Sequence, residues 1–268
     1  MSELRGSGSS RLAAPGGRAE PEAAAAAATP ERSSASEAAE PETAAVAVLD
    51  EAGRRLRAPW AASTAGLLFS VLFTAAMVLL RTSPLTTAND AELRRLFADG
   101  QDLSMVVGGL YLAPFAGVMF LWFVAVIRDQ VGDREDHFFA TVFFGSGLLF
   151  VALVWASAAA SSAIVVGVRY FGLEVPPAAV MGWMRSLAYA LAFAFATRAA
   201  AVFMISAASI GLRSRTFPNW FAWTGYLFGA VLLLGVAFWD WIILLLPAWV
   251  AAVSLFILRR ERARSRTA

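Results

Sequence analysis

The chain has 268 residues, of which 59% are hydrophobic, and its mean hydropathy is +0.63. An ordinary soluble domain is less apolar, and a formal net charge of +2 is too small to indicate nucleic-acid binding. Since cysteine is absent, disulfides, thiolate metal sites and cysteine nucleophiles are excluded.

Residues 1–53 form a polar segment with almost no large apolar side chains. Such a composition cannot bury enough apolar surface to offset the conformational entropy lost on ordering. We therefore expect a disordered cytoplasmic tail. A regulatory or partner-binding tail is the alternative interpretation.

Six apolar runs follow, and each approaches the length of about 20 residues that a helix needs to cross a bilayer. They predict an all-α fold: a polytopic membrane protein with a bundle of six transmembrane helices over residues 54–260. A basic cytoplasmic tail is expected over 261–268. The predicted spans are 60–80, 105–127, 138–167, 187–212, 219–238 and 242–258.

The loop 81–104 contains the pattern of a short amphipathic helix. Asn89 is a good N-cap, and Glu92 follows three residues later as in a capping box. Apolar residues then recur on one face, at Leu93, Leu96 and Phe97. The pattern predicts a helix that lies on the outer membrane surface or caps the bundle, with a gate over a cavity as the alternative.

The arginines are distributed unequally between the two sides of the predicted bundle. With the N-terminus inside, the inner segments contain twelve arginines, among them Arg128 and Arg213. The outer loops contain five, which are Arg81, Arg94, Arg95, Arg169 and Arg185. Because cytoplasmic loops carry an excess of basic residues, both termini are predicted to be cytoplasmic.

Arg198 is the one charged residue near the middle of a predicted span. A charge at the bilayer centre costs about 2.5–3.5 kcal/mol on insertion scales, so its side chain should face the bundle or a wet cavity. Its possible partners are backbone carbonyls freed at helix kinks near Pro114 and Pro247, hydroxyl groups such as those of Ser161 or Tyr226, or an external anion. The interpretations are an arginine that snorkels or caps carbonyls, and a ligand site for an anion or lipid headgroup.

The loop 128–137 concentrates acidic residues beside the single histidine of the chain. Carboxylates and imidazole can hold a metal ion or transfer protons. The candidates for such acid–base or metal chemistry are Asp133, Glu135, Asp136 and His137. Their spacing matches no recurring motif, which favours a solvated hairpin loop neutralised by its own ion pairs.

The familiar enzyme signatures are absent, including a Walker-type loop, H-E-x-x-H and G-x-S-x-G. The sequence therefore favours a non-enzymatic membrane component that is transport-related or binds a partner, without a cofactor. Its expected partners are the lipid bilayer and an anionic small molecule or lipid headgroup, and not nucleic acid. The alternatives are an enzyme acting on a lipid headgroup at the cytoplasmic face, and a purely structural module. A polar cavity at the loop 128–137 would favour the enzyme, and an outward or midplane cavity around Arg198 would favour transport.

Two stretches are similar to a known type of protein. Residues 114–150 contain F-L-W-F-V-A-V-I-R-D followed by E-D-H-F-F-A-T-V-F-F-G-S-G-L-L-F, and residues 213–235 contain F-P-N-W-F-A-W-T-G-Y. Together they resemble a family of actinobacterial multi-pass, six-helix integral membrane proteins of unknown function. The resemblance implies a bacterial cytoplasmic membrane and the same six-span layout. It implies no activity and no catalytic residues.

Overall fold

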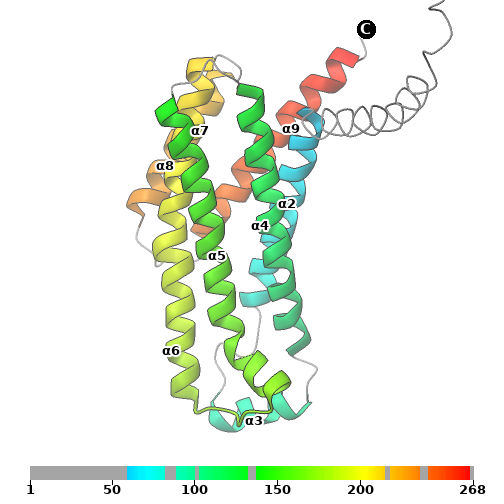
Figure 1. Ribbon diagram of the computed structural model, residues 1–268, viewed down its shortest axis with the longest axis vertical. Helices are drawn as coiled ribbons and strands as arrows, with labels where there is room; N and C mark the ends of the chain where they lie inside the picture. Colours follow the sequence, from blue (N-terminus) through cyan, green and yellow to red (C-terminus); the bar gives the residue numbers. More distant parts are fainter. Residues whose placement is uncertain are drawn as a thin grey trace, which may run out of the picture. The chain divides into compact units, whose positions relative to one another are not determined.

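The computed structural model describes residues 59–81, 89–99, 103–131, 137–214, 218–235 and 241–265, and the predicted tail 1–53 lies outside this set. All regular structure in these ranges is helical (Figure 1), which confirms the all-α part of the predicted fold class. The elements are α2 (Pro59–Arg81), α3 (Asp90–Asp99), α4 (Leu103–Val131), α5 (His137–Phe171), α6 (Ala178–Tyr189), the π-helical segment η3 (Ala190–Ala196), α7 (Thr197–Ser214), α8 (Asn219–Leu234), the short 3-10 helix η4 (Ile242–Leu244) and α9 (Leu245–Ser265).

Five helical stretches in the described residues are long and apolar enough to cross a membrane: Trp60–Arg81, Leu110–Arg128, Phe138–Phe171, Ala178–Arg213 and Ile242–Ala263. Large apolar side chains stay exposed on their surfaces, as at Val71 and Phe115. Such a surface is suited to lipid and unsuited to water. The chain is thus a multi-pass helical membrane protein. The sixth predicted span coincides with α8, an apolar helix of only 16 residues.

Two of the helices are longer than the spans predicted for them. Helix α5 has 35 residues and extends for about 52 Å, whereas the hydrocarbon core of a bilayer is about 30 Å thick. Its end is marked by Gly172, whose φ of +67° is left-handed. After this turn α6, η3 and α7 form one continuous helix, which begins nine residues before the predicted span 187–212. Arg185 was expected in an outer loop, but it lies within this helix.

A cluster of phenylalanine rings joins four helices in the core. Phe120 of α4 lies at its centre, with ring centroids 4.7 Å from Phe69 of α2, 5.2 Å from Phe150 of α5 and 5.0 Å from Phe203 of α7. All four side chains are fully buried. Around this cluster α2 packs against α4 and α9, α5 packs against α4 and α7, and α7 packs against α8.

Helix α3 begins with the predicted capping box. The Asn89 side chain accepts hydrogen bonds from the N–H groups of Ala91 and Glu92, and the Glu92 carboxylate accepts one from the N–H of Asn89. Leu93 and Phe97 are buried as expected. Asp90 also accepts a 2.6 Å hydrogen bond from the N–H of Ala178, at the start of α6. Helix α3 therefore caps the end of the bundle where α5 ends and α6 begins (Figure 1).

Small side chains allow α2 and α9 to approach closely. Ser70 donates a 2.8 Å hydrogen bond to the carbonyl of Pro247 in the first turn of α9. One turn earlier, a Cβ atom added at Gly66 would overlap the Ser254 hydroxyl and lie 2.8 Å from the Phe123 ring. The Ser254 hydroxyl is fully buried and has no hydrogen-bond partner within the described part of the chain.

This contact predicts a specific pattern of stabilities. Gly66→Ala should destabilise the protein by about 1–3 kcal/mol, because overpacking forces its neighbours apart. Ser254→Ala alone should be neutral or stabilising, since it removes an unsatisfied buried hydroxyl. In the Gly66→Ala background, Ser254→Ala should recover part of the loss. Thermal unfolding in detergent measures all three variants.

The matched control is Gly145→Ala on α5, where an added Cβ would meet nothing within 4 Å. It should leave the unfolding temperature unchanged or slightly higher. Equal stability of Gly66→Ala and the parent protein would contradict the close packing of α2 and α9.

Candidate functional site

Arg198 lies in the first turn of α7, directly after the π-helical segment η3. Its Nη1 atom donates to the carbonyl of Phe193 at 2.8 Å and to the hydroxyl of Thr197 at 3.1 Å. Its Nη2 atom donates to the carbonyl of Gly235 at 3.1 Å, directly after the last residue of α8. The side chain is half-buried. The guanidinium group therefore bridges α7 and the end of α8.

The surroundings of Arg198 explain why a cation is tolerated there. Carbonyls at the end of a helix lack an intrahelical partner, and the negative end of the helix dipole favours a positive charge. In the π-helical segment the backbone hydrogen bonds join residues five apart in the chain, so the regular α-helical pattern is interrupted there. Arg198 donates hydrogen bonds both to the π-helical segment and to the end of α8. This geometry matches the carbonyl-capping interpretation.

The hydroxyl groups considered as partners of Arg198 have other partners. Tyr226 shares a 2.8 Å hydrogen bond with Ser209, and Ser161 donates to the carbonyl of Ser157. The carbonyls that Arg198 does use, those of Phe193 and Gly235, are not the ones expected near Pro114 and Pro247. Nothing in the pattern of residues 190–196 signals a π-helical turn. Anion binding at Arg198 stays a prediction.

Of the acid–base candidates, only His137 belongs to a described helix, at the opposite end of α5 from α3. Asp133, Glu135 and Asp136 fall outside the described ranges, and only the backbone of His137, the first residue of α5, is described. No group of three or more His, Cys, Asp or Glu residues that could hold a metal ion occurs in the part of the chain that the structure describes. A metal or acid–base role for these residues stays a prediction.

The described start of α5 does not lie close to Arg198. The Arg213 guanidinium lies 4.5 Å from the ring centroid of Phe139, so the start of α5 is beside the end of α7. Arg198 is 15 residues before Arg213, which is about 22 Å along the helix. A cavity beside Arg128, at the same end, has a volume of about 20 Å³ and a mainly aromatic and aliphatic lining. It has room for about one water molecule.

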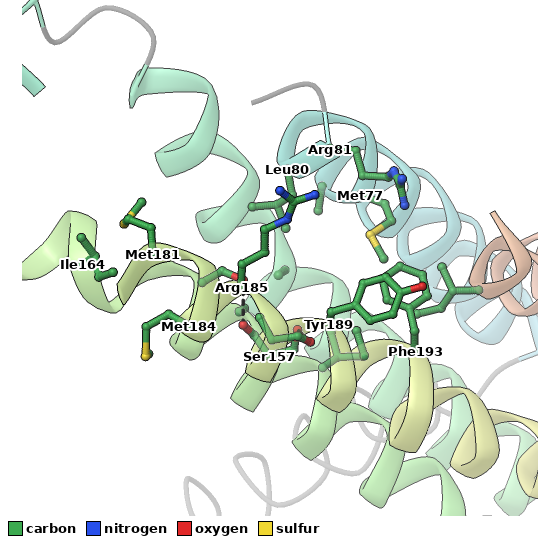
Figure 2. Close-up of a pocket in the computed structure, with 18 of the residues that line it drawn as sticks. Met77, Leu80, Arg81, Ser157, Ile164, Met181, Met184, Arg185, Tyr189 and Phe193 are labelled. Carbon is green, nitrogen blue, oxygen red and sulfur yellow. Dashed lines mark hydrogen bonds between the residues drawn. The ribbon is translucent and has the colours of Figure 1, made fainter. Parts of the chain in front are cut away.

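A larger cavity lies in the other half of the bundle and was not predicted from the sequence. It has a volume of about 390 Å³, with α2 and α6 as its walls and α5 as its floor (Figure 2). One face of α2 lines it at helical spacing, at Phe73, Ala76, Met77, Leu80 and Arg81. The facing residues of α6 include Met181, Gly182, Arg185, Ala188 and Tyr189. The sequence signal for this wall is the spacing i, i+3, i+4, i+7 of its lining residues in α6. Residues 178–186 were expected in a loop, so this helical pattern was not recognised.

The polar groups of this cavity are few and have distinct positions. Arg81 ends α2, and its guanidinium lies 5.5 Å from the centre of the Trp241 ring. Arg185 extends from α6 towards the end of α2 (Figure 2). Ser157 on the floor donates a 2.7 Å hydrogen bond to the carbonyl of Ala188, which fastens α6 to α5. Two cations thus lie beside a largely apolar cavity.

The cavity is a groove because its two walls, α2 and α6, pack against different helices. Helix α6 packs against α5 and η3, whereas α2 packs against α4 and α9. Phe193 and Ile243 line the groove and also belong to the buried core, so they mark its deep end. Besides α2, α5 and α6, the described lining includes only a few residues of α4, η3 and η4.

No protein-family model matches this chain, and neither a curated protein nor a solved structure shows significant similarity to it. The groove and the Arg198 bridge must therefore be interpreted from their own chemistry.

The Arg198 bridge predicts the effect of its removal. Arg198→Leu should destabilise the protein by about 1–3 kcal/mol, because the carbonyls of Phe193 and Gly235 lose a charged donor. Arg198→Lys should lose less, since an ammonium keeps the charge but lacks the planar fork that reaches both carbonyls. The unfolding temperature in detergent is the measurement.

Arg169→Leu is the control, because Arg169 is an exposed arginine in the last turn of α5. It should change the unfolding temperature little. If Arg198→Leu were more stable than the parent protein, the arginine would be snorkelling and the bridge would contribute nothing.

Proposed function

We propose that this protein is a non-enzymatic, six-span component of a bacterial cytoplasmic membrane, transport-related or partner-binding, that holds an amphipathic small molecule in the groove between α2 and α6. The observation that carries the proposal is the groove itself. Its volume of about 390 Å³ lies within the range of about 300–1,000 Å³ that is typical of ligand pockets. Apolar walls with a few convergent polar groups are also typical of such pockets.

The position of the groove favours ligand binding over the two alternatives. An enzyme acting through the loop 128–137 needs a cavity at that loop, and the cavity beside Arg128 holds only about 20 Å³. A purely structural module needs no cavity with polar groups. The groove lies towards the α3 end, which is the outward side in the predicted topology.

The predicted topology is supported by the separation of the arginines along the helices. Arg94, in α3, and Arg169, at the end of α5, lie at one end of the bundle. Arg128 and Arg213 lie at the other, where their guanidinium groups pack on the rings of Phe144 and Phe139. With α8 as a sixth span, the start of α2 and the end of α9 lie on the side of Arg128 and Arg213, which we assign to the cytoplasm.

Labelling of single cysteines tests the topology, since the chain has no native cysteine. Cysteines are introduced at Ser83, Gly132 and Ser214 and treated in intact cells with a reagent that does not cross the membrane. Only the cysteine at position 83 should react before the cells are opened. Labelling at position 132 in intact cells would reverse the orientation.

Filling the groove tests ligand binding. Gly182 lines the groove, and an added Cβ there would meet nothing within 4 Å, so Gly182→Trp should fold normally and occupy the space. Gly145→Trp is the matched control, because it is equally unobstructed but outside the groove. Native mass spectrometry of the purified proteins should detect a co-purified amphipathic molecule in the parent and the control. Gly182→Trp should lose it, and retention in all three proteins would refute binding in the groove.

A further inference from the structure

We infer that the groove binds a lipid phosphate, with the phosphate between Arg81 and Arg185 and one alkyl chain in the deeper half against Phe73, Met77 and Phe193. The inference rests on the proposed function, because it names the ligand class of the same groove. The groove therefore binds a lipid with a net negative headgroup more tightly than a zwitterionic lipid. Three features of the groove support the inference. They are the charge of its lining, the hydrogen bonds that its hydroxyl groups already make, and the depth of its apolar half along α2.

The charge of the groove is positive. Its described lining includes two arginines and no carboxylate. Guanidinium groups match the geometry of phosphate oxygens, because two parallel N–H donors can bind two oxygens at once. The Trp241 ring beside Arg81 holds that guanidinium at the end of α2 through a cation–π contact, which leaves its charge in place. Arg185 approaches from the opposite wall (Figure 2).

The deeper half of the groove is suited to carbon and not to polar groups. Its two serine hydroxyl groups already donate to backbone carbonyls, Ser157 to Ala188 and Ser161 to Ser157. The ring of Tyr189 stacks on that of Phe193, with centroids 4.5 Å apart. Phe73, Ala76 and Met77 present an aromatic ring, a methyl group and a thioether. Methionine side chains adapt to irregular apolar ligands because they are flexible and polarisable. An alkyl chain therefore fits this half better than a sugar or an amino acid.

The depth of the groove matches the distribution of charge in a lipid. Arg81 and Trp241 are residue types that mark the interface between headgroups and hydrocarbon. Phe73 is eight residues before Arg81 on α2, which places it about 12 Å deeper along the helix axis. A lipid with its phosphate at Arg81 would thus place its chain at hydrocarbon depth.

The test compares lipids and variants on the purified, full-length protein in a neutral detergent. Phosphatidylglycerol, phosphatidylcholine with the same chains, and sodium phosphate are titrated separately, and binding is followed by the shift in unfolding temperature and by native mass spectrometry. The variants are Arg81→Gln with Arg185→Gln, and the control Arg94→Gln with Arg95→Gln. The control removes two exposed arginines of α3, which do not line the groove.

Phosphatidylglycerol should bind the parent and the control tightly, and phosphatidylcholine should bind more weakly. In the Arg81 and Arg185 variant, binding of phosphatidylglycerol should weaken by about 10–100-fold, as expected for the loss of charge-assisted hydrogen bonds. Should the double variant fail to fold because Arg81 leaves Trp241, Arg185→Gln alone tests the same point. Arg185 is exposed on α6, so this single change should fold.

Three outcomes would overturn the inference. In the first, both lipids bind equally well to the parent and to the arginine variant, and Gly182→Trp loses this binding. The groove would then bind lipid chains independently of headgroup charge, and the proposed function would stand. Protection by sodium phosphate equal to that by phosphatidylglycerol would identify a free anion as the ligand. Unchanged lipid binding in Gly182→Trp would place the lipid elsewhere and refute both proposals.

Discussion

The constraint on which this structure depends is that a backbone group in hydrocarbon must find its hydrogen-bond partner within the protein. Helices satisfy most carbonyls themselves, and the exceptions attract side-chain donors. Arg198 donates to Phe193 in the π-helical turn and to Gly235 after α8, and Ser70 donates to Pro247. An intramembrane charge thus has a structural explanation before any functional one is needed. It also joins η3, part of the groove wall, to the end of α8.

The unequal length of the helices creates the groove. Helix α2 has 23 residues, close to the thickness of a bilayer, whereas α5 and the continuous stretch Ala178–Arg213 have 35 and 36. The two long helices continue past the end of α2, and α6 packs mainly on α5 and η3. A space therefore remains between α6 and α2 near the membrane surface. Helix α3 caps this end and fastens α6 through Asp90.

The accuracy of sequence reasoning differed from element to element. Apolar run length predicted the fold class and located the long helices, and the capping box at Asn89 predicted α3. The same method failed at residues 178–186, where Arg185 suggested a loop although the helix continues. Hydropathy averages a window and cannot tell a charged residue on a helix beyond the membrane from one in a turn. That error concealed one whole wall of the groove.

By itself, the sequence determined that this is a multi-pass helical membrane protein, because an apolar stretch of about 20 residues has only one stable way to cross lipid. It also singled out Arg198 as a residue that needs an explanation. Only the tertiary structure decided which carbonyls Arg198 meets, and that Arg81 and Arg185 share a cavity. These contacts join residues far apart in the chain, and they depend on helix register and packing, which local sequence patterns do not encode.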